Sequence, residues 1–234
     1  MEFNRDSFIE GKLLLINKPI GWTSFQVVNK IRWLIKTTFD IKKIKVGHAG
    51  TLDPLAQGLL IICTGKLTKK IEEFQSANKG YTGTFFLGAT TPSFDLETQI
   101  DSKTSIKNIS LKKLNLVSKN FLGISQQTPP IFSAIKVDGK KLYNYARKGE
   151  TVKIKKREIN IFKFNLGKVN LPLLDFEIEC SKGTYIRSIA NDFGKELKVG
   201  AYLHKLIRTS VGKFNLMDAL EIKDFEMKIK EISR

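Results

Sequence analysis

The sequence predicts an α+β protein whose mixed, largely antiparallel central sheet is flanked by helices and loops. Strand-like and helix-like stretches follow one another without the regular strand–helix alternation that builds a parallel α/β sheet. The Asp138-Gly139 pair between strand-like flanks is a strong signal for a β-hairpin, which joins antiparallel strands. No repeat, low-complexity linker or Pro- or Gly-rich boundary divides the chain, so residues 1–234 are expected to form a single domain.

The first third of the chain predicts two strands separated by a helix. Residues 11–19, GKLLLINKP, indicate a strand that ends at Pro19, and Ser24 can cap the helix that follows. Five apolar side chains of this helix keep helical spacing: Val27, Val28, Ile31, Leu34 and Ile35. Residues 58–65, GLLIICTG, form a continuous apolar run, as expected of a buried strand.

The remaining elements follow from the same two periodicities. Helices are expected over residues 66–75, 110–121 and 184–197, the last of them capped, and strands over 80–89, 157–180 and 201–214. The first of these helices is expected to turn Ile71 and Phe74 inward. The stretch 157–180 is long enough for two or more strands.

A net charge of +17 favours an anionic polymer as the partner of this chain. Lys and Arg number 40 against 23 Asp and Glu, and the isoelectric point is near 9.8, which is typical of nucleic-acid-binding proteins. The alternative is a chain made basic for solubility. The longest apolar runs, 13–16 and 59–63, are far shorter than the roughly 18 residues of a membrane span, and the N-terminus lacks a signal-type apolar core. A soluble, cytoplasmic protein that does not associate with membranes is expected.

The cysteines and histidines do not favour metal or thiol chemistry. Cys63 and Cys180 each lie in an apolar run, so both are expected to be buried, reduced thiols. Two His and two Cys without close spacing do not make a zinc site, and no metal ligand is predicted. A P-loop in residues 58–68 is excluded because Leu67 stands where Ser or Thr would bind magnesium.

Asp53 is an acidic residue between a run of small residues and a run of apolar ones. It precedes Pro54, which biases its backbone toward an extended conformation. Gly47 and Gly50 let the preceding loop bend tightly or approach a ligand closely. The local pattern fits a rigidly held functional carboxylate, but it favours the commoner alternative, a turn aspartate that accepts a main-chain hydrogen bond.

Residues 47–60, GHAGTLDPLAQGLL, closely resemble the signature of the TruB family, the bacterial synthases that make pseudouridine in the T loop of tRNA. Four further stretches resemble other motifs of that family, in the family's order. They are INKPIGWTS at 16–24, KGY at 79–81, TPPIFSAIKVDGKKLYNYARKG at 128–149 and CSKGTYIRSIANDFG at 180–194. The five motifs extend over most of the chain, and they imply the pseudouridine synthase fold.

The resemblance assigns catalytic roles to three residues. Asp53 corresponds to the catalytic aspartate, Tyr81 to the tyrosine that stacks on the target base, and Arg187 to the arginine that pairs with the aspartate. It also implies five substrate-binding residues: Lys18 and Pro19 near the pocket, His48 in the space left by the flipped nucleotide, Tyr185 in the active site and Leu206 in the base pocket. Taken singly, Tyr81 and Leu206 could be core residues and Arg187 a surface charge of its helix.

The implied reaction is the isomerisation of uridine 55 to pseudouridine. The N1–C1′ bond breaks, the uracil turns and the bond re-forms through C5, so no cofactor, ATP or metal is required. The base must first leave its stack, which costs a few kcal/mol, and stacking on Tyr81 returns about 1–3 kcal/mol. Arg187 within about 4–6 Å would keep Asp53 ionised, and the Tyr81 hydroxyl is a candidate for handling the C5 proton.

A thumb-like insertion over residues 126–152 is expected to hold the T stem-loop of tRNA. Five cations of this insertion are candidates for contacts with the RNA backbone: Lys136, Lys140, Lys141, Arg147 and Lys148. Tyr143 and Tyr145 lie among them, which suits stacking as well as phosphate contact. A solvated hairpin would also be charged. No protein partner is implied, and a monomer is expected.

Three departures from the family pattern bear on these expectations. Ala49 replaces a Thr, and Pro92 replaces an Asp, for which Asp95 could compensate. The chain also leaves no room for the C-terminal PUA domain of many bacterial members, so a minimal catalytic domain is expected. Two alternatives stay open: a non-catalytic tRNA-binding or tRNA-folding chaperone, and a related synthase that acts on rRNA or is guided by RNA.

Overall fold

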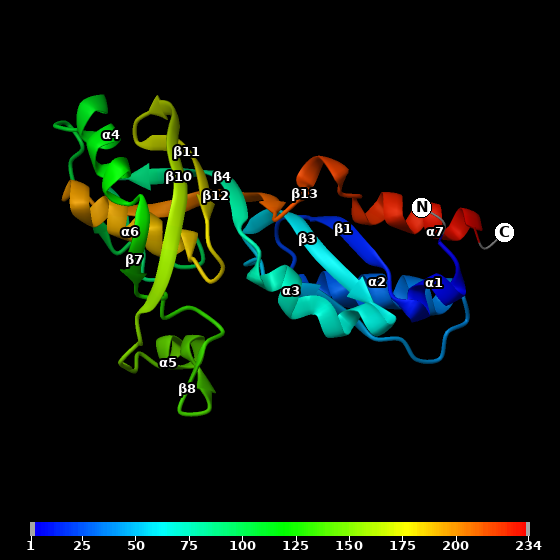
Figure 1. Ribbon diagram of the computed structural model, residues 1–234. Helices are drawn as coiled ribbons and strands as arrows, with labels where there is room; N and C mark the ends of the chain where they lie inside the picture. The colour runs from blue at the N-terminus through cyan, green and yellow to red at the C-terminus, as the bar shows by residue number, and fades with distance from the viewer. Residues whose placement is uncertain (1–2, 233–234) are drawn as a thin grey trace. The chain divides into compact units, whose positions relative to one another are not determined.

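The computed structural model describes residues 3–232 and contains a mixed central sheet with helices on it (Figure 1). Its strands follow the order β1 (Leu13–Lys18), β3 (Ala56–Thr64), β12 (Ala201–Val211), β4 (Lys79–Leu87), β11 (Leu173–Cys180), β10 (Arg157–Asn170) and β7 (Gly123–Gln127). At the side of this path, β2 (Val46–Ala49) joins β3 and β13 (Phe214–Asn215) joins β12. The pairing of β12 with β3 is parallel, whereas β1–β3, β2–β3, β7–β10 and β10–β11 are antiparallel. The predicted α+β class with a mixed, largely antiparallel sheet is confirmed.

The chain divides into two compact units. The first unit comprises the residues up to Tyr81 and from Leu206 onward, and the second comprises Thr82 to Lys205. Strands β4 (Lys79–Leu87) and β12 (Ala201–Val211) contribute residues to both.

In the described part of the chain, the first unit combines an antiparallel group of strands with four α-helices and two short 3₁₀ helices. Its elements are α1 (Arg5–Glu10), β1 (Leu13–Lys18), α2 (Ser24–Thr38), β2 (Val46–Ala49), β3 (Ala56–Thr64), the 3₁₀ helix η1 (Gly65–Lys70), α3 (Ile71–Ser76), β13 (Phe214–Asn215), η2 (Leu216–Asp218) and α7 (Ile222–Ile232). Helices α1, α2 and α7 share a core with β1 and β3, in which Phe8, Ile31 and Phe225 are completely buried. Buried and partly exposed residues alternate along β1. Strand β3 is buried almost continuously, as the apolar run of residues 58–65 predicts.

Helix α2 begins one residue earlier than the sequence predicts. Its N-cap is Thr23, whose hydroxyl accepts a hydrogen bond from the Gln26 N–H, while the Gln26 side chain accepts one from the Thr23 N–H. Ser24, the predicted cap, is buried instead. Its hydroxyl donates to the Leu52 carbonyl and accepts from the Leu52 N–H, at 3.1 and 2.9 Å. Ser24 therefore fixes the residue that precedes Asp53.

The loop that the sequence places before Asp53 is shorter than expected. Val46–Ala49 forms strand β2, in which His48 is opposite Ile62 of β3, so Gly47 does not belong to a loop. Gly50 follows this strand with a φ of 93°, a left-handed conformation that favours glycine.

The second unit packs two helices against an antiparallel group of strands. Its elements are β5 (Ala89–Thr90), β6 (Ser102–Lys103), α4 (Leu111–Asn120), β7 (Gly123–Gln127), β8 (Lys136–Val137), β9 (Lys140–Lys141), α5 (Leu142–Arg147), β10 (Arg157–Asn170), β11 (Leu173–Cys180) and α6 (Ile186–Leu197). Figure 1 shows α4 and α6 beside β10. Phe85 lies at the centre of this core, where its ring stacks on Phe176 at 4.1 Å and contacts Phe193 at 5.7 Å.

Several element predictions are confirmed, and others need correction. The Asp138-Gly139 turn joins β8 to β9 with positive φ at both residues, as the hairpin signal predicts, and Cys63 and Cys180 are buried free thiols. The predicted 66–75 helix is divided into η1 and α3. Helix α6 starts after Tyr185 without a side-chain cap. Beyond β12 the sequence predicted no element, whereas β13 and α7 follow.

Within residues 3–232, no helix combines the length and the apolar character needed to cross a membrane.

Candidate active site

Asp53 lies in a turn between β2 and β3 that is anchored on both sides. Leu52 is bound by Ser24, and the Pro54 carbonyl accepts a hydrogen bond from the Gly21 N–H at 2.8 Å. The Asp53 carbonyl itself accepts from the Ala56 N–H at 3.1 Å, at the start of β3. The half-buried Asp53 is therefore presented by a rigid backbone rather than by a mobile loop.

Lys18 ends β1 with a completely buried side chain. Its ammonium group donates to the carbonyls of Pro19 and Trp22, at 2.9 and 2.5 Å, and so closes the turn that follows β1. Burial lowers the pKa of Lys18 to about 8, an effect that attraction to Asp53 opposes and repulsion by Arg208 reinforces. The structure thus brings the predicted Lys18 and Asp53 into electrostatic contact.

Arg208 of β12 is a buried cation to which no sequence motif assigned a role. Only 1% of Arg208 is exposed. Its Nε donates to the Leu59 carbonyl at 2.7 Å and its Nη2 to the Gly50 carbonyl at 3.0 Å. Burial lowers the Arg208 pKa, whereas the hydrogen bond with the Tyr81 side chain raises it. The available signal was the sequence LIRTSV, which places one arginine inside an apolar strand.

Two more predicted residues, Tyr81 and His48, lie near Arg208 in the first unit, and Leu206 precedes it on β12. Tyr81 of β4 is 8% exposed, so its ring is largely buried while its hydroxyl is bonded to Arg208. His48 has a pKa below its usual value because of burial and the nearby Arg208 cation, which favours a neutral imidazole. Leu206 is buried opposite Ala56 in the β12–β3 pair. The partly buried Pro19 follows Lys18 in the same turn.

Arg187 belongs to the second unit, where it is buried against an aspartate. Its side chain is 4% exposed, its Nε lies 3.5 Å from Asp95 Oδ2, and its Nη1 donates to the Ser93 carbonyl at 3.3 Å. Arg187 is therefore no surface charge of α6. The pairing of Arg187 with Asp53 that the resemblance implies remains a prediction.

Asp95 occupies a compact turn that contains the unusual Pro92. The hydroxyls of Thr91 and Ser93 both donate to the Asp95 carbonyl, at 2.7 and 3.1 Å, and the Asp95 carboxylate accepts from the Glu97 N–H at 2.9 Å. These bonds hold the carboxylate toward Arg187. Asp95 thus supplies Arg187 with a buried acidic partner, whereas Pro92 of the same turn carries no carboxylate.

Tyr185 precedes α6 and is positioned by its main chain. The Gln127 side chain accepts from the Tyr185 N–H at 2.8 Å and donates to the Tyr185 carbonyl at 3.1 Å. The Arg157 guanidinium lies 5.3 Å from the centre of the Tyr185 ring. Gln127 therefore connects β7 to the start of the helix that carries Arg187.

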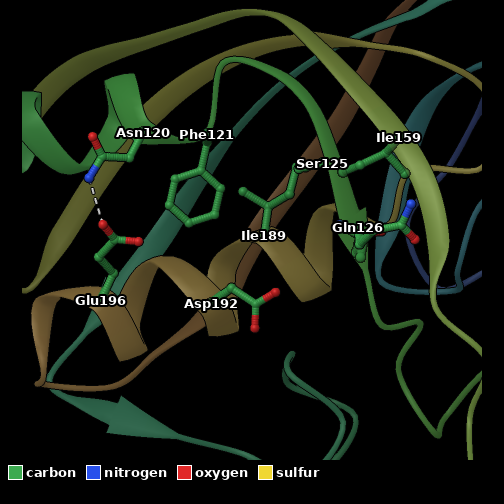
Figure 2. Close-up of a pocket in the computed structure, with 9 residues that line it drawn as sticks. Asn120, Phe121, Ser125, Gln126, Ile159, Ile189, Asp192 and Glu196 are labelled. Carbon is green, nitrogen blue, oxygen red and sulfur yellow. Dashed lines mark hydrogen bonds between the residues drawn. The ribbon is translucent and has the colours of Figure 1, made fainter.

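Gln127 also lines a cavity of about 210 Å³ in the second unit, shown in Figure 2. It is lined by Asn120, Phe121, Ser125, Gln126, Gln127, Ile159, Ile189, Asp192 and Glu196. The Asp192 pKa is raised by burial, against the opposing effect of the Lys195 cation. This cavity contains none of the residues that the sequence predicts for the site.

The predicted thumb presents its cations to solvent. All five are exposed: Lys136, Lys140, Lys141, Arg147 and Lys148. Two of them, Lys141 and Arg147, lie 5.4 and 5.3 Å from the centre of the Tyr143 ring. The Tyr145 hydroxyl donates to the Val137 carbonyl at 3.1 Å and so ties α5 to the hairpin. Tyr143 and Tyr145 thus lie among the thumb cations, and their contacts also stabilise the fold of the thumb.

Comparison with known proteins finds similar sequences that are described as pseudouridine synthases. The family model described as TruB family pseudouridylate synthase (N terminal domain) matches residues 36–186, which include Asp53 and Tyr81. The tRNA pseudouridine synthase B of Flavobacterium johnsoniae is 51% identical over 94% of this chain and 97% of that protein. The protein of the same name from Phocaeicola vulgatus is 52% identical over 94% and 93%.

Solved structures show the same fold at lower identity. In a Cbf5–Nop10–Gar1 complex, the similar chain is 23% identical with a TM-score of 0.73, over 99% of this chain and 61% of that one. A chain of an H/ACA RNP bound to a substrate RNA is 23% identical with a TM-score of 0.67, over 94% and 53%. This chain spans about three fifths or less of those two proteins. The pseudouridine synthase fold that the sequence motifs implied is confirmed.

Proposed function

Since the chain belongs to the TruB family of pseudouridylate synthases, we propose that it isomerises uridine 55 in the T loop of tRNA to pseudouridine. The observation that carries this proposal is the identity of about one half to proteins named tRNA pseudouridine synthase B, over nearly their whole length. The net charge of +17 supports a polyanionic substrate. We also propose that the protein is a cytoplasmic monomer, which acts on tRNA without a cofactor, a metal ion or a protein partner.

The reaction needs a carboxylate that stays ionised beside RNA phosphates. We propose that Asp53 is this group and initiates cleavage of the N1–C1′ bond after the uridine has left its stack. The anchored turn supports the proposal because it fixes the direction of the carboxylate. The Lys18 cation, which interacts with Asp53, favours the ionised form of the carboxylate at neutral pH.

The other site residues are proposed to hold the flipped nucleotide. Tyr81 stacks on the uracil, and Arg187 pairs with Asp53 while Asp95 holds Arg187 from its other side. His48, neutral at physiological pH, takes the space that the nucleotide leaves.

The pocket and the RNA grip complete the proposal. Pro19, Tyr185 and Leu206 contribute to the base pocket, and the exposed thumb cations bind the backbone of the T stem-loop. The thumb, taken as residues 126–152, is proposed to be an insertion in one catalytic domain.

The test is to incubate the protein with unmodified tRNA, without cofactor, and to map pseudouridine by chemical labelling. Product at uridine 55 is expected with the wild type and not with Asp53→Asn, whose binding to tRNA should be retained. Binding without product would identify a tRNA-binding or tRNA-folding chaperone. Product in rRNA, but none in tRNA, would identify a synthase of different specificity.

A further inference from the structure

Arg208 is an unusual residue because its guanidinium is buried among uncharged oxygens. The hydrogen-bond acceptors that the structure gives it are the carbonyls of Leu59 and Gly50 and the oxygen of Tyr81. Removing a cation from water is costly unless strong partners compensate it. The lowered pKa of Arg208 reflects this cost. A chain that needed only to fill the core could use an apolar residue of similar volume at this position.

The three acceptors belong to three segments that the proposed reaction requires. Gly50 begins the turn that presents Asp53, and Leu59 lies in the strand after that turn. Tyr81 is the proposed stacking residue on β4. Arg208 itself is held by the parallel pairing of β12 with β3, opposite Gly58. One side chain therefore connects the backbone of the carboxylate turn to the aromatic ring.

We propose that Arg208 is a positioning residue for pseudouridine formation, which fixes the Tyr81 ring relative to the Asp53 turn. This inference rests on the proposed function and goes beyond it, because no motif of the sequence assigned a role to Arg208. The planar guanidinium presents its donors in a rigid fork, so it can bond to a carbonyl, a second carbonyl and a phenol oxygen at once. Lysine carries the same charge but lacks that fork.

Two glycines leave room for this arrangement. A Cβ at Gly58 would lie 2.4 Å from the Arg208 carbonyl oxygen and 2.7 Å from its nitrogen, so only glycine allows β12 to approach β3 so closely. A Cβ at Gly50 would lie 3.4 Å from Arg208 Nη1. Gly50 and Gly58 belong to the stretch that carries the family resemblance. The close approach of the Arg208 backbone requires glycine at position 58, and the φ of 93° favours glycine at position 50.

The experiment compares Arg208→Lys with Arg32→Lys. Arg32 is a matched control because it also donates to a main-chain carbonyl of the first unit, that of Val46, at 3.0 Å. Single-turnover pseudouridine formation at saturating enzyme measures the chemical rate, and filter binding measures the dissociation constant for tRNA. We expect Arg208→Lys to lower the rate about 10- to 100-fold, as small misplacements of reacting groups do, with the dissociation constant changed less than about twofold. Arg32→Lys should match the wild type in both.

A double-mutant cycle with Tyr81→Phe distinguishes positioning from a general structural role. If Arg208 acts through the Tyr81 hydroxyl, Arg208→Lys should lower the rate less in the Tyr81→Phe background than in the wild type. Equal effects of Arg208→Lys in both backgrounds would overturn the proposal. So would a wild-type rate for Arg208→Lys, or a loss confined to tRNA binding.

A second variant serves if Arg208→Lys does not fold, as judged by circular dichroism and thermal unfolding. Gly50→Ala strains the backbone at the carbonyl to which Arg208 donates, because φ is 93° there, while it leaves the arginine in place. Its control is Gly123→Ala, since Gly123 also has a positive φ, 89°, but has no heavy atom within 4 Å of the added Cβ. A slower chemical rate is expected for Gly50→Ala alone, and a wild-type rate would refute the role of Arg208.

The same assay distinguishes a failure of the proposed function from a failure of the proposed role of Arg208. Wild-type protein and Asp53→Asn are measured in the same assay, so an inactive wild type would overturn both proposals. An active wild type with an equally active Arg208→Lys would overturn the role of Arg208 alone.

Discussion

Two buried cations, Lys18 and Arg208, lie close to Asp53 and Tyr81, and they respond differently to burial. The pKa of Lys18 is lowered to about 8 from 10.5, so this group can lose its proton under mildly alkaline conditions. Arg208 has a lowered pKa as well, but a guanidinium stays protonated across the range in which proteins are studied. Lys18 is therefore the residue whose charge pH can change.

The lowered pKa of Lys18 predicts a specific pH dependence of stability. Between pH 8 and 10.5 the unfolded chain keeps the Lys18 proton while the folded protein loses it, so the unfolded state binds more protons. The free energy of unfolding of the wild type should therefore increase with rising pH between pH 8 and 10.5. Relative to Lys18→Met, which lacks the group, the gain between pH 7.5 and 10 should be about 2 kcal/mol. Urea unfolding at pH 7.5 and 10 measures it, and parallel changes in both proteins would contradict the prediction.

Sequence reasoning found most candidate residues but missed Arg208. Asp53, Lys18 and Tyr81 lie in motifs that can be recognised locally. The burial of Arg208 depends on its contact with Leu59, 149 positions away in the chain, and no local pattern encodes that contact. An arginine in an apolar strand is ambiguous from sequence, because an edge strand and a buried site both accommodate it.

At the scale of elements, local signals predicted well wherever a turn or a cap decides the structure. The Asp138-Gly139 hairpin formed because both residues tolerate a positive φ. Strand β2 was missed because its four residues form a strand only through pairing with β3. Helix α7 was missed too. Phe225 and Ile229 on its buried face show helical spacing, but their core exists only once α2 and the N-terminal residues are in place.

The connection between β7 and α6 yields a prediction of its own. Gln127→Leu removes two hydrogen bonds to the main chain of Tyr185 and leaves that N–H and carbonyl without their side-chain partner. We expect a loss of about 1–3 kcal/mol of stability, together with lower activity, because α6 carries Arg187. Thermal unfolding and the single-turnover rate measure both effects.

Gln126→Leu is the control for this variant. Gln126 is the exposed neighbour of Gln127 on the same strand. A stability change for Gln126→Leu as large as that for Gln127→Leu would show that the bonds to Tyr185 are not the cause.

The thumb cations predict a change in the salt dependence of tRNA binding. Neutralising Lys140, Lys141 and Lys148 together by Gln should weaken binding and flatten the plot of log affinity against log salt, because fewer counterions are released. The control replaces Lys42, Lys43 and Lys45, three exposed cations of the first unit, in the same way. An unchanged slope for the thumb variant in filter binding would remove the thumb from the interface.

At the scale of the whole molecule, the net charge and the extent of the protein–RNA contact decide how much of the tRNA is needed for turnover. The proposed thumb and base pocket both act on the T stem-loop, and the charge of +17 gives affinity without further specific contacts. We therefore expect turnover on an isolated T stem-loop within about tenfold of that on whole tRNA, measured as kcat/KM in one buffer. A preference of about a thousandfold for whole tRNA would contradict this.

The position of β12 between β3 and β4 has a consequence for biosynthesis. β12 begins at Ala201, so translation at about 5–20 residues per second completes β3 on the order of ten seconds before β12 emerges. During that interval β3 and β4 lack the strand that separates them, and Arg208 has not been made. A nascent chain therefore carries Asp53 and Tyr81 well before it can assemble the site around them. The proposed site is complete only once this later strand is inserted between two earlier ones.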